Sequence, residues 1–455
     1  MTKVPKDVKN PLTYRSSQGD LGDFKCVNTN VSNLGEDSPL KVMASLIHAV
    51  SKKDNSQHTV FPLPTDLPPL AASSIRVRTT LITLSSNNLT YARNGHALAW
   101  WLTWPILSSA PAPYNDADWG VVPAWGYATV LESTVQDVSV DTHLYGFWPT
   151  SSHPVDLQLR ASEPRGHWVE TSPHRHALMS LYNHYVQEPL VPASGEELPL
   201  KLAFQCGYLA SRFVFPARGE PVHPLGVALP WTERDGDWSE AVVVSLSASS
   251  KTGRGFAWNV LRNREKGAGP LALLQATSAP GALRAWEDGE VTVPSKAVGY
   301  GELSGTETLK WMESFGPRRI VVLDFGARNG VLQRFVEAMK KGREGNESSP
   351  DITVIAVGGE MKVYSDEDME GMKASMEQLQ KVQFNTSGVR EKGIELEGPD
   401  DYFRNLNAAF ARCKKDDGMG HFEIIRTEGV EGIENIWQDL CEQTVKPDQA
   451  VVVQV

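Results

Sequence analysis

The sequence contains little cysteine, and no two cysteines stand at a metal-binding spacing. Its four cysteines (Cys26, Cys206, Cys413 and Cys441) lie far apart, and no C-x-x-C motif occurs among them. This scatter excludes a zinc ribbon and a disulfide framework. The sequence therefore offers no cysteine-based metal centre and no covalent cross-links from which to argue a fold.

Long apolar runs are absent as well. No stretch approaches the roughly 18 apolar residues that a membrane span needs, and residues 1–20 show no apolar signal-peptide core. We therefore expect a soluble, cytoplasmic protein with no membrane association. The formal net charge of −11 also disfavours nucleic acid as a partner, because phosphate contacts need a basic surface.

Along its 455 residues the sequence changes from a strand-like to a mixed strand and helix pattern of apolar residues. Residues 74–155 alternate apolar and polar side chains between Gly, Pro and Asp turns, which predicts a compact β-barrel. Residues 174–185 and 200–215 have the apolar spacing of helices. The length and the 41% hydrophobic content allow two or three domains with substantial cores.

Beyond residue 240 short apolar strands alternate with helical segments. The expected strands are 241–246, 271–276, 298–300, 320–325 and 352–357, and the helical segments are 254–263, 281–287, 304–315 and 332–341. Further helices are expected near 367–381, 400–414 and 433–443, before a terminal strand 451–455. Alternating strands and helices predict a doubly wound, mostly parallel sheet, so the fold class is α/β.

The first strand of that sheet runs into a turn where a dinucleotide-binding protein carries G-x-G-x-x-G. Here the glycines are missing, and hydroxyl and ammonium donors for a phosphate stand in the turn instead: Ser247, Ser249, Ser250, Lys251 and Thr252. The next strand ends at Thr277 and Ser278 without the acid that binds the ribose of NAD, which favours NADP. Alternatively, the side chains of Ser249 and Ser250 obstruct the pyrophosphate, and the hydroxyls only cap a helix beginning near Gly253.

Several segments resemble the medium-chain dehydrogenase/reductase superfamily, which pairs a GroES-like barrel with a Rossmann-type sheet. Residues 86–95 (SNNLTYARNG) are similar to its N-x-x-D-x-x-x-R-x-G segment, and residues 125–132 (WGYATVLE) to its G-H-E-x-x-G-V-V-E strand. Closer still is the family DUF2855, a fungal and bacterial branch, which the stretches NNLTYARNG, WGYATVLES, LYGFWP, PHRHALMSLYNHY, SLSASSKTGRGFAW and QATSAP resemble.

The resemblance implies a domain plan and excludes catalytic zinc. It implies a GroES-like substrate domain over 1–205, a Rossmann-type domain over 206–365, and a return segment over 366–455 that completes the first domain. A homodimer is expected because the superfamily usually forms one. Ser86, Trp125 and Gly126 stand where the zinc-dependent relatives carry Cys, His and Glu, so no zinc site is expected.

The site residues are expected around an apolar pocket. Tyr91 is placed to donate a proton, with Asn87, Asn88, Trp125 and Trp148 as substrate-binding neighbours. Tyr182 and Tyr185 are further phenols that a helix would bring to one face. Alternatively, these tyrosines and tryptophans are core residues that only pack, the tyrosine hydroxyls bonding to the backbone.

Three functions remain open at this stage. The leading hypothesis is a zinc-independent, NADPH-dependent reductase of a hydrophobic enone or carbonyl compound in secondary metabolism. The alternative is a non-redox cyclase, isomerase or lyase, such as a pericyclase, on a scaffold that has lost its dinucleotide. The third is a non-catalytic binding protein. In each case the partner is a hydrophobic small molecule.

Overall fold

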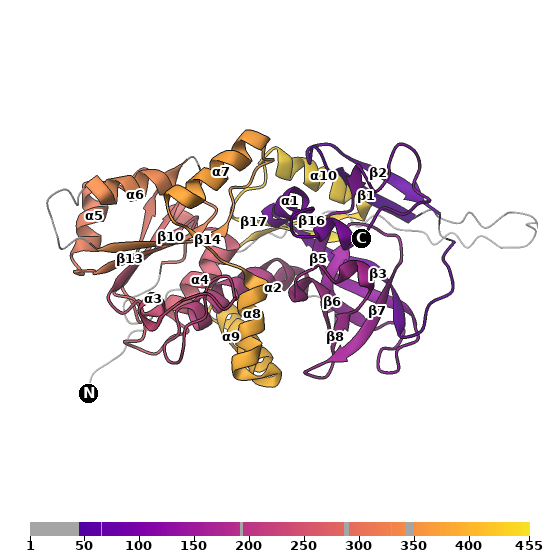
Figure 1. Cartoon of the computed structure of the whole chain (residues 1–455), viewed down its shortest axis with the longest axis horizontal. Helices are drawn as coiled ribbons and strands as arrows, with labels where there is room; N and C mark the ends of the chain where they lie inside the picture. Colours follow the sequence, from indigo (N-terminus) through magenta and orange to yellow (C-terminus); the bar gives the residue numbers. More distant parts are fainter. Residues whose placement is uncertain (1–44, 65, 192–193, 286–290, 329, 342–349) are drawn as a thin grey trace, which may run out of the picture. The chain divides into compact units, whose positions relative to one another are not determined.

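The structure is a computed structural model that describes residues 45–64, 66–191, 194–285, 291–328, 330–341 and 350–455. Cys26, the residues from 1 to 44 and the end of the segment expected to be helical at 281–287 lie outside the described residues. The described chain combines a closed antiparallel barrel with a parallel sheet covered by helices (Figure 1). This confirms the expected α/β class, a GroES-like barrel plus a Rossmann-type sheet.

Six antiparallel strands form the barrel, and a second pairing between its first and last strands closes it. They are joined in the order β3 (Ser74–Leu84), β5 (Pro123–Ser133), β6 (His143–Pro149), β9 (His184–Gln187), β8 (His167–Glu170) and β7 (Val155–Ser162), with β7 pairing again with β3. β7 alternates buried and exposed side chains, as a strand with one face on a core should. The predicted barrel is confirmed, but residues 74–155 supply only β3, β5 and β6 in full, and β7, β8 and β9 extend it to Gln187.

A small sheet precedes the barrel in the chain and was not foreseen. It joins β2 (His58–Leu63), β1 (Ser45–Ser51) and β4 (Trp119–Gly120) in antiparallel register. The polar residues that end and follow β1, from Ser51 to Asp54, lie beside the loop that leads into β4.

All six strands of the second sheet run parallel, in the order β12 (Ser295–Gly299), β11 (Ala272–Thr277), β10 (Ala241–Leu246), β13 (Arg319–Phe325), β14 (Asp351–Gly358) and β15 (Val382–Gln383). Numbered by appearance this order is 3-2-1-4-5-6, that of a dinucleotide-binding sheet. The chain reverses direction across the sheet between β10 and β13. Ligands of such folds bind at that point, outside the carboxyl ends of the strands.

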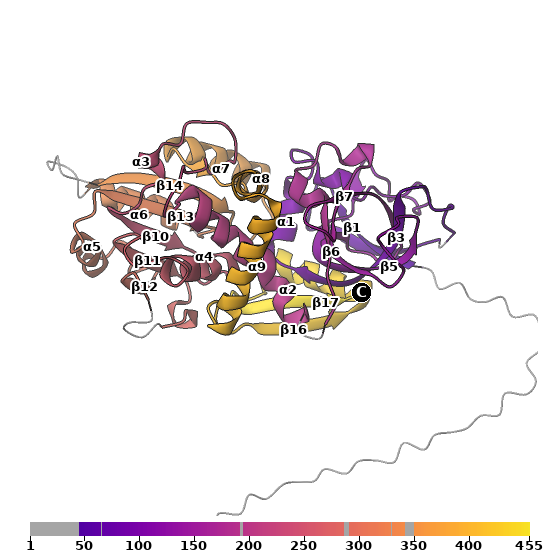
Figure 2. The same ribbon diagram turned by 90° about the horizontal axis from the view of Figure 1, so that it is seen from below.

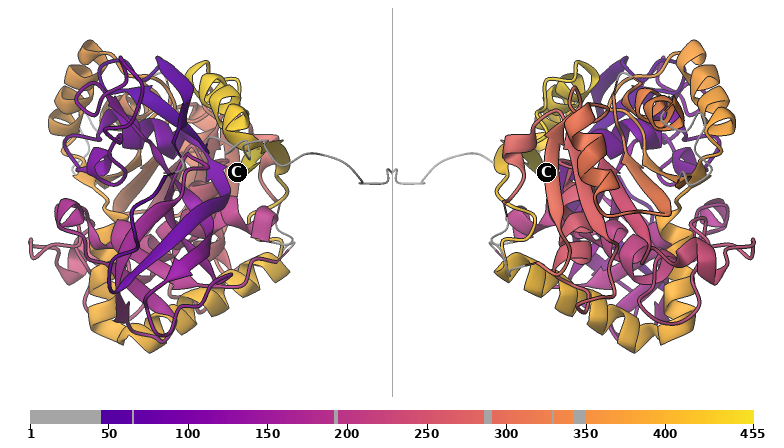
Figure 3. Two further views of the ribbon diagram at one scale, coloured as in Figure 1. Left: turned by 90° about the vertical axis from the view of Figure 1, so that its right-hand side faces the viewer. Right: turned by 90° about the vertical axis from the view of Figure 1, so that its left-hand side faces the viewer.

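Helices cover both faces of this sheet, which explains why its central strands are apolar without alternation. Helices α5 (Thr306–Glu313) and α6 (Val331–Lys341) pack on one face, and α2 (Ser194–Leu209) and α4 (Lys251–Leu261) on the other (Figures 1 and 3). The α2–α4 contact is close because of two glycines. A Cβ on Gly207 would lie 2.4 Å from Phe256 N, and one on Gly255 would lie 3.1 Å from Phe204 Cα.

The C-terminal part returns to the barrel. Helices α7 (Asp366–Gln378), α8 (Thr386–Glu397) and α9 (Pro399–Lys415) are followed by β16 (Glu423–Glu428), α10 (Gly429–Cys441) and β17 (Gln449–Gln454). Strand β17 pairs with β3, while α8 and α9 pack into the core beneath the parallel sheet, where Figure 2 shows them beside α2. The expected domain boundaries stay a prediction.

Two expected helices are wrong. Residues 174–185 form the short 3₁₀ turns η2 (Pro173–Arg175) and η3 (Ser180–Asn183) and then enter β9, because pairing with β6 and β8 overrides a weak helical spacing. Near 281–287 the described residues hold only the 3₁₀ turn η5 (Pro280–Ala282). Helix α8 was not expected at all.

Candidate active site

The turn between β10 and α4 lies at the point where the sheet order reverses. Ser247 leaves the strand with φ 56°, in the left-handed region that favours glycine. Ser250 then caps the helix, and its Oγ accepts a hydrogen bond from Gly253 N at 3.1 Å. The cap places the start of the helix at Lys251, two residues before the expected position. Serine thus performs the capping role that the sequence had left as an alternative.

Gly253 shows that the turn corresponding to G-x-G-x-x-G begins one residue later than predicted from the sequence. A Cβ at this position would lie 2.8 Å from Ala248 O and 3.0 Å from Ser247 O, so only glycine lets the helix approach the end of the strand this closely. Close helix–strand packing is the role of the third fingerprint glycine. The turn is therefore A-x-S-x-x-G over residues 248–253, and not a glycine-free motif over 247–252.

The N-terminus of α4 retains free donors. Within the described part of the chain, the amides of Lys251 and Thr252 have no hydrogen-bond partner. Two such amides and the positive end of the helix dipole suit a phosphate group.

The side chains predicted to hold a phosphate are mostly engaged elsewhere. Ser249 and Thr277 are buried and share a 2.6 Å hydrogen bond between their hydroxyls. Ser278, at the end of β11, is exposed. No acidic residue ends this strand.

Lys251 points to the return strand. Its Nζ donates to Gln449 O at 2.8 Å and lies 5.3 Å from the centre of the Phe422 ring. Burial, with a smaller contribution from the charge of Arg254, lowers the pKa of Lys251 to about 8. A phosphate role for this ammonium stays a prediction, and in the structure it joins α4 to β17.

Arg254, which sequence reasoning missed, lies one turn further along the same helix. Its Nε donates to Ser249 O at 2.9 Å, and its Nη1 donates to Met419 O at 3.1 Å and to His421 O at 3.3 Å. Its guanidinium lies 4.3 Å from the ring of Phe422. The basic face of α4 therefore holds the backbone of the return segment.

On the barrel side, Tyr91 belongs to a buried cluster of aromatic rings. It lies on α1 (Ser86–Arg93), and its Oη accepts a hydrogen bond from Trp125 Nε1 at 3.0 Å. Its ring centre is 5.0 Å from that of Phe147, 4.8 Å from that of Trp100 and 5.9 Å from that of Tyr182. The structure thus brings together Tyr91, Tyr182 and Trp125, three residues chosen from the sequence.

Burial sets the protonation of this cluster. It raises the pKa of both Tyr91 and Tyr182, so both phenols carry their protons at neutral pH. The buried thiol of Cys206, on α2, interacts electrostatically with both phenols, and burial raises its pKa to about 12. The buried phenols are protonated and can act as proton donors, whereas the Cys206 thiol is not ionised at neutral pH and is therefore a poor nucleophile.

Tyr185 and Trp148 make contacts of their own in the barrel core. Tyr185 is fully buried in the barrel, where its Oη accepts from Arg175 Nη1 at 2.8 Å and donates to Phe147 O at 3.1 Å. Trp148 is also fully buried and donates from Nε1 to Gly126 O at 3.0 Å. Since the segment is not a helix, Tyr182 and Tyr185 do not share a helical face.

The two asparagines differ in exposure. Asn88 is buried, its Oδ1 accepting from Ser85 N at 2.8 Å and its Nδ2 donating to Pro123 O at 2.9 Å, so its amide is used within the protein. Asn87 is exposed. Substrate-binding roles for both stay predictions.

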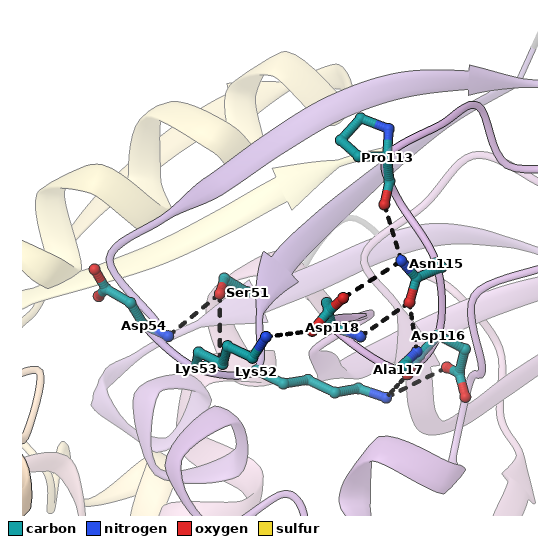
Figure 4. Close-up of polar contacts among 9 residues, drawn as sticks. All are labelled: Ser51, Lys52, Lys53, Asp54, Pro113, Asn115, Asp116, Ala117 and Asp118. Atoms are coloured by element: carbon teal, nitrogen blue, oxygen red, sulfur yellow. Dashed lines mark hydrogen bonds and ion pairs between the residues drawn. The ribbon is translucent and has the colours of Figure 1, made fainter.

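Two ion pairs join the end of β1 to the loop that precedes β4 (Figure 4). Lys52 also lies beside the turn η1 (Trp100–Leu102), which follows α1. Lys52 Nζ lies 3.4 Å from Asp116 Oδ1 and 5.8 Å from the ring of Trp101, while Lys53 Nζ lies 2.6 Å from Asp118 Oδ1. The end of β1 is thereby paired with the loop before β4 and lies beside Trp101.

A cavity of about 630 Å³ opens at a different part of the barrel. Its lining includes His143, Arg165, His167 and Glu188, and no residue predicted for the site. Among the described residues, no group of three or more His, Cys, Asp or Glu side chains could hold a metal ion. None of the described helices is long and apolar enough to span a membrane.

The sequence matches a family described as "Protein of unknown function (DUF2855)" over residues 82–446, well over half of the chain. The chain belongs to this family, as the motifs of the barrel and the α4 turn had indicated. No curated protein sequence matches it.

Several solved structures are similar. CurA from Vibrio vulnificus in complex with NADPH is 11% identical over 90% of this chain and 99% of that one, with a TM-score of 0.46. A mutant form of enoyl thioester reductase from Candida tropicalis is 9% identical over 91% and 100%, with a TM-score of 0.49. The CurF ER cyclopropanase from the curacin A biosynthetic pathway is 12% identical over 90% and 99%, with a TM-score of 0.47. At these values the similarities assign no ligand or reaction to this chain.

Proposed function

We propose that this protein is a zinc-independent, NADPH-dependent reductase of an apolar enone or carbonyl compound. The observation that carries the proposal is the N-terminus of α4. It offers two amides without partners at the point where the sheet order reverses, and Gly253 gives it the close approach of a fingerprint turn. The exposed Ser278 and the lack of an acid at the end of β11 suit a 2′-phosphate.

In this proposal the amides of Lys251 and Thr252 hold the pyrophosphate, and the bound NADPH supplies a hydride to the substrate. The chain supplies the proton. Tyr91 is protonated at neutral pH, since its phenol has an ordinary pKa of about 10 that burial raises, and the hydrogen bond from Trp125 fixes its oxygen. Tyr182 lies beside it as the second phenol of a relay.

Fluorescence titration with NADPH and with NADH tests this proposal. Thr252 is half-buried at the second helical position, so Thr252→Asp places a carboxylate among the phosphate donors while favouring the helix itself. We expect this variant to lose about tenfold or more in NADPH affinity. The isosteric, uncharged Thr252→Asn should stay within about twofold of the unmodified protein. Absence of saturable binding by either cofactor would reject the reductase.

A second candidate, a cyclase, isomerase or lyase that uses the same phenols without a dinucleotide, has one observation in its favour. The Ser249–Thr277 and Lys251–Gln449 hydrogen bonds occupy side chains that were predicted to hold phosphate. It predicts no NADPH binding, together with turnover of apolar polyketide or terpenoid substrates that Tyr91→Phe abolishes. A protein with neither property would be a binding protein.

A further inference from the structure

Arg93, at the end of α1, is a partly buried cation that forms no ion pair with any Asp or Glu of the described residues. Burial lowers its pKa, while the charge interaction and the side-chain hydrogen bond with Tyr364 oppose that shift. Within the part of the chain that the structure describes, no Asp or Glu forms an ion pair with Arg93, and its buried Nε has no hydrogen-bond partner. A buried guanidinium normally has a carboxylate or several carbonyls around it.

The guanidinium reaches the carboxyl end of the parallel sheet. Its Cζ lies 3.9 Å from the centre of the Tyr364 ring, in the loop that follows β14. A Cβ on Gly359 would lie 3.2 Å from Arg93 Nη2, and one on Gly326, after β13, would lie 2.4 Å from Gly359 O. Glycine therefore lets the two loops and the guanidinium come together at the edge where ligands of this fold bind.

This position differs from that of the α4 turn. Strands β13 and β14 belong to the second mononucleotide-binding half of the sheet, whereas β10 and α4 open the first half. In the same loop Lys362 pairs with Asp368 at 2.7 Å, and the backbone carbonyl of Glu360 accepts from Tyr364 Oη at 3.1 Å. Among the described residues the carboxylate of Glu360 forms no ion pair with Arg93.

We propose that Arg93 binds the carboxylate of the substrate, which makes the substrate class an apolar carboxylic acid. The proposal rests on the reductase function above and deepens it by naming the charged group. A guanidinium presents paired N–H donors that match a carboxylate in a bidentate contact, and the ligand would supply the missing counter-charge.

The test is calorimetric binding of trans-2-octenoate and of trans-2-octenamide, which differ in charge but hardly in shape, with and without NADPH. We expect the protein to prefer the acid by about tenfold or more. Arg93→Met, which keeps the stem of the side chain, should bind both probes about equally, and Arg93→Lys should keep part of the preference. The NADPH affinity of Arg93→Met should stay within about twofold of the unmodified protein.

A matched variant separates binding from a structural role. If Arg93 only holds the loop through Tyr364, Tyr364→Leu would remove the preference as fully as Arg93→Met, and that result would overturn the proposal. Equal binding of both probes by the unmodified protein would overturn it too, as would loss of NADPH affinity in place of octenoate affinity. Because the octenoate preference is measured without NADPH as well, its failure is distinguishable from failure of the Thr252 experiment.

Discussion

Replacing Lys251 by methionine should remove a rise in the free energy of unfolding that the buried lysine produces between about pH 8 and pH 10. The ammonium is buried between α4 and β17, donates to Gln449 O at 2.8 Å and has a pKa lowered to about 8. If Lys251 were instead a phosphate-binding side chain at an open helix N-terminus, its ammonium would be exposed to water and its pKa would lie near the ordinary value of about 10.4. The two roles therefore differ in an observable way.

The sign and size follow from proton linkage. Below pH 8 the amine is protonated in both the folded and the unfolded chain, so it adds no pH dependence. Between pH 8 and about 10.5 the unfolded chain still binds a proton that the folded chain has released, so the free energy of unfolding rises with pH. From pH 7.5 to 9.5 the gain is about 2 kcal/mol. At pH 7.5 the variant should lie within about 2 kcal/mol of the unmodified protein, because losing a charged hydrogen bond offsets removing a buried charge.

Urea unfolding at pH 7.5 and at pH 9.5 measures the difference. Subtracting the variant from the unmodified protein cancels the buried tyrosines and all other groups that titrate in this range. Lys53→Met is the matched control, because the side chain of Lys53 is 79% exposed and should give a difference independent of pH. If the difference for Lys251→Met is equally flat, the lysine is solvated and the docking role is wrong.

Three further predictions follow from other contacts. Ser278→Asp should move the preference between the two cofactors about tenfold toward NADH, measured by fluorescence titration, because a carboxylate there accepts from the ribose and repels a 2′-phosphate. Lys52→Met should lower the free energy of unfolding by about 1–2 kcal/mol, measured in urea, because its side chain is only 7% exposed beside Asp116. Burial lowers the pKa of His48 to about 3 and that of His167 to about 4, so stability present above pH 6.5 is lost as the pH falls toward these values. Each histidine should remove about 2 kcal/mol by pH 5, and a flat urea midpoint between pH 7 and pH 5 would contradict this assignment.

The fold was largely predictable because its signals are local. The apolar run at residues 241–246 is β10 to the residue, since a strand buried on both faces leaves a continuous apolar pattern. Residues 174–185 failed for the opposite reason. Their spacing fits a helix, but β9 gains its stability from pairing with β6 and β8, which no local pattern records.

The phenol cluster was predictable in composition but not in geometry. Tyr91, Tyr182 and Trp125 could be chosen because the motifs around them are distinctive, yet only the fold shows that Trp125 donates to Tyr91. Arg93 stood in the same motif and received no role. That it meets no carboxylate among the described residues is a property of the packed structure, which the sequence around it does not reveal.

The α4 turn shows why recognising a motif does not fix the roles of its side chains. Lys251, Arg254 and Trp258 are spaced by three and four residues, so the sequence already places them on one face of a helix. What that face binds lies far along the chain. Lys251 donates to a carbonyl 198 residues away, Arg254 to one 165 residues away, and Trp258 Nε1 to Asp416 Oδ2 at 3.1 Å. A backbone carbonyl leaves no signal in the sequence. The sequence therefore cannot distinguish a cation that donates to the return segment from one that binds a phosphate. Under the proposed function the backbone amides would hold the dinucleotide, so a charge introduced at Thr252 tests cofactor binding more cleanly than the removal of Lys251.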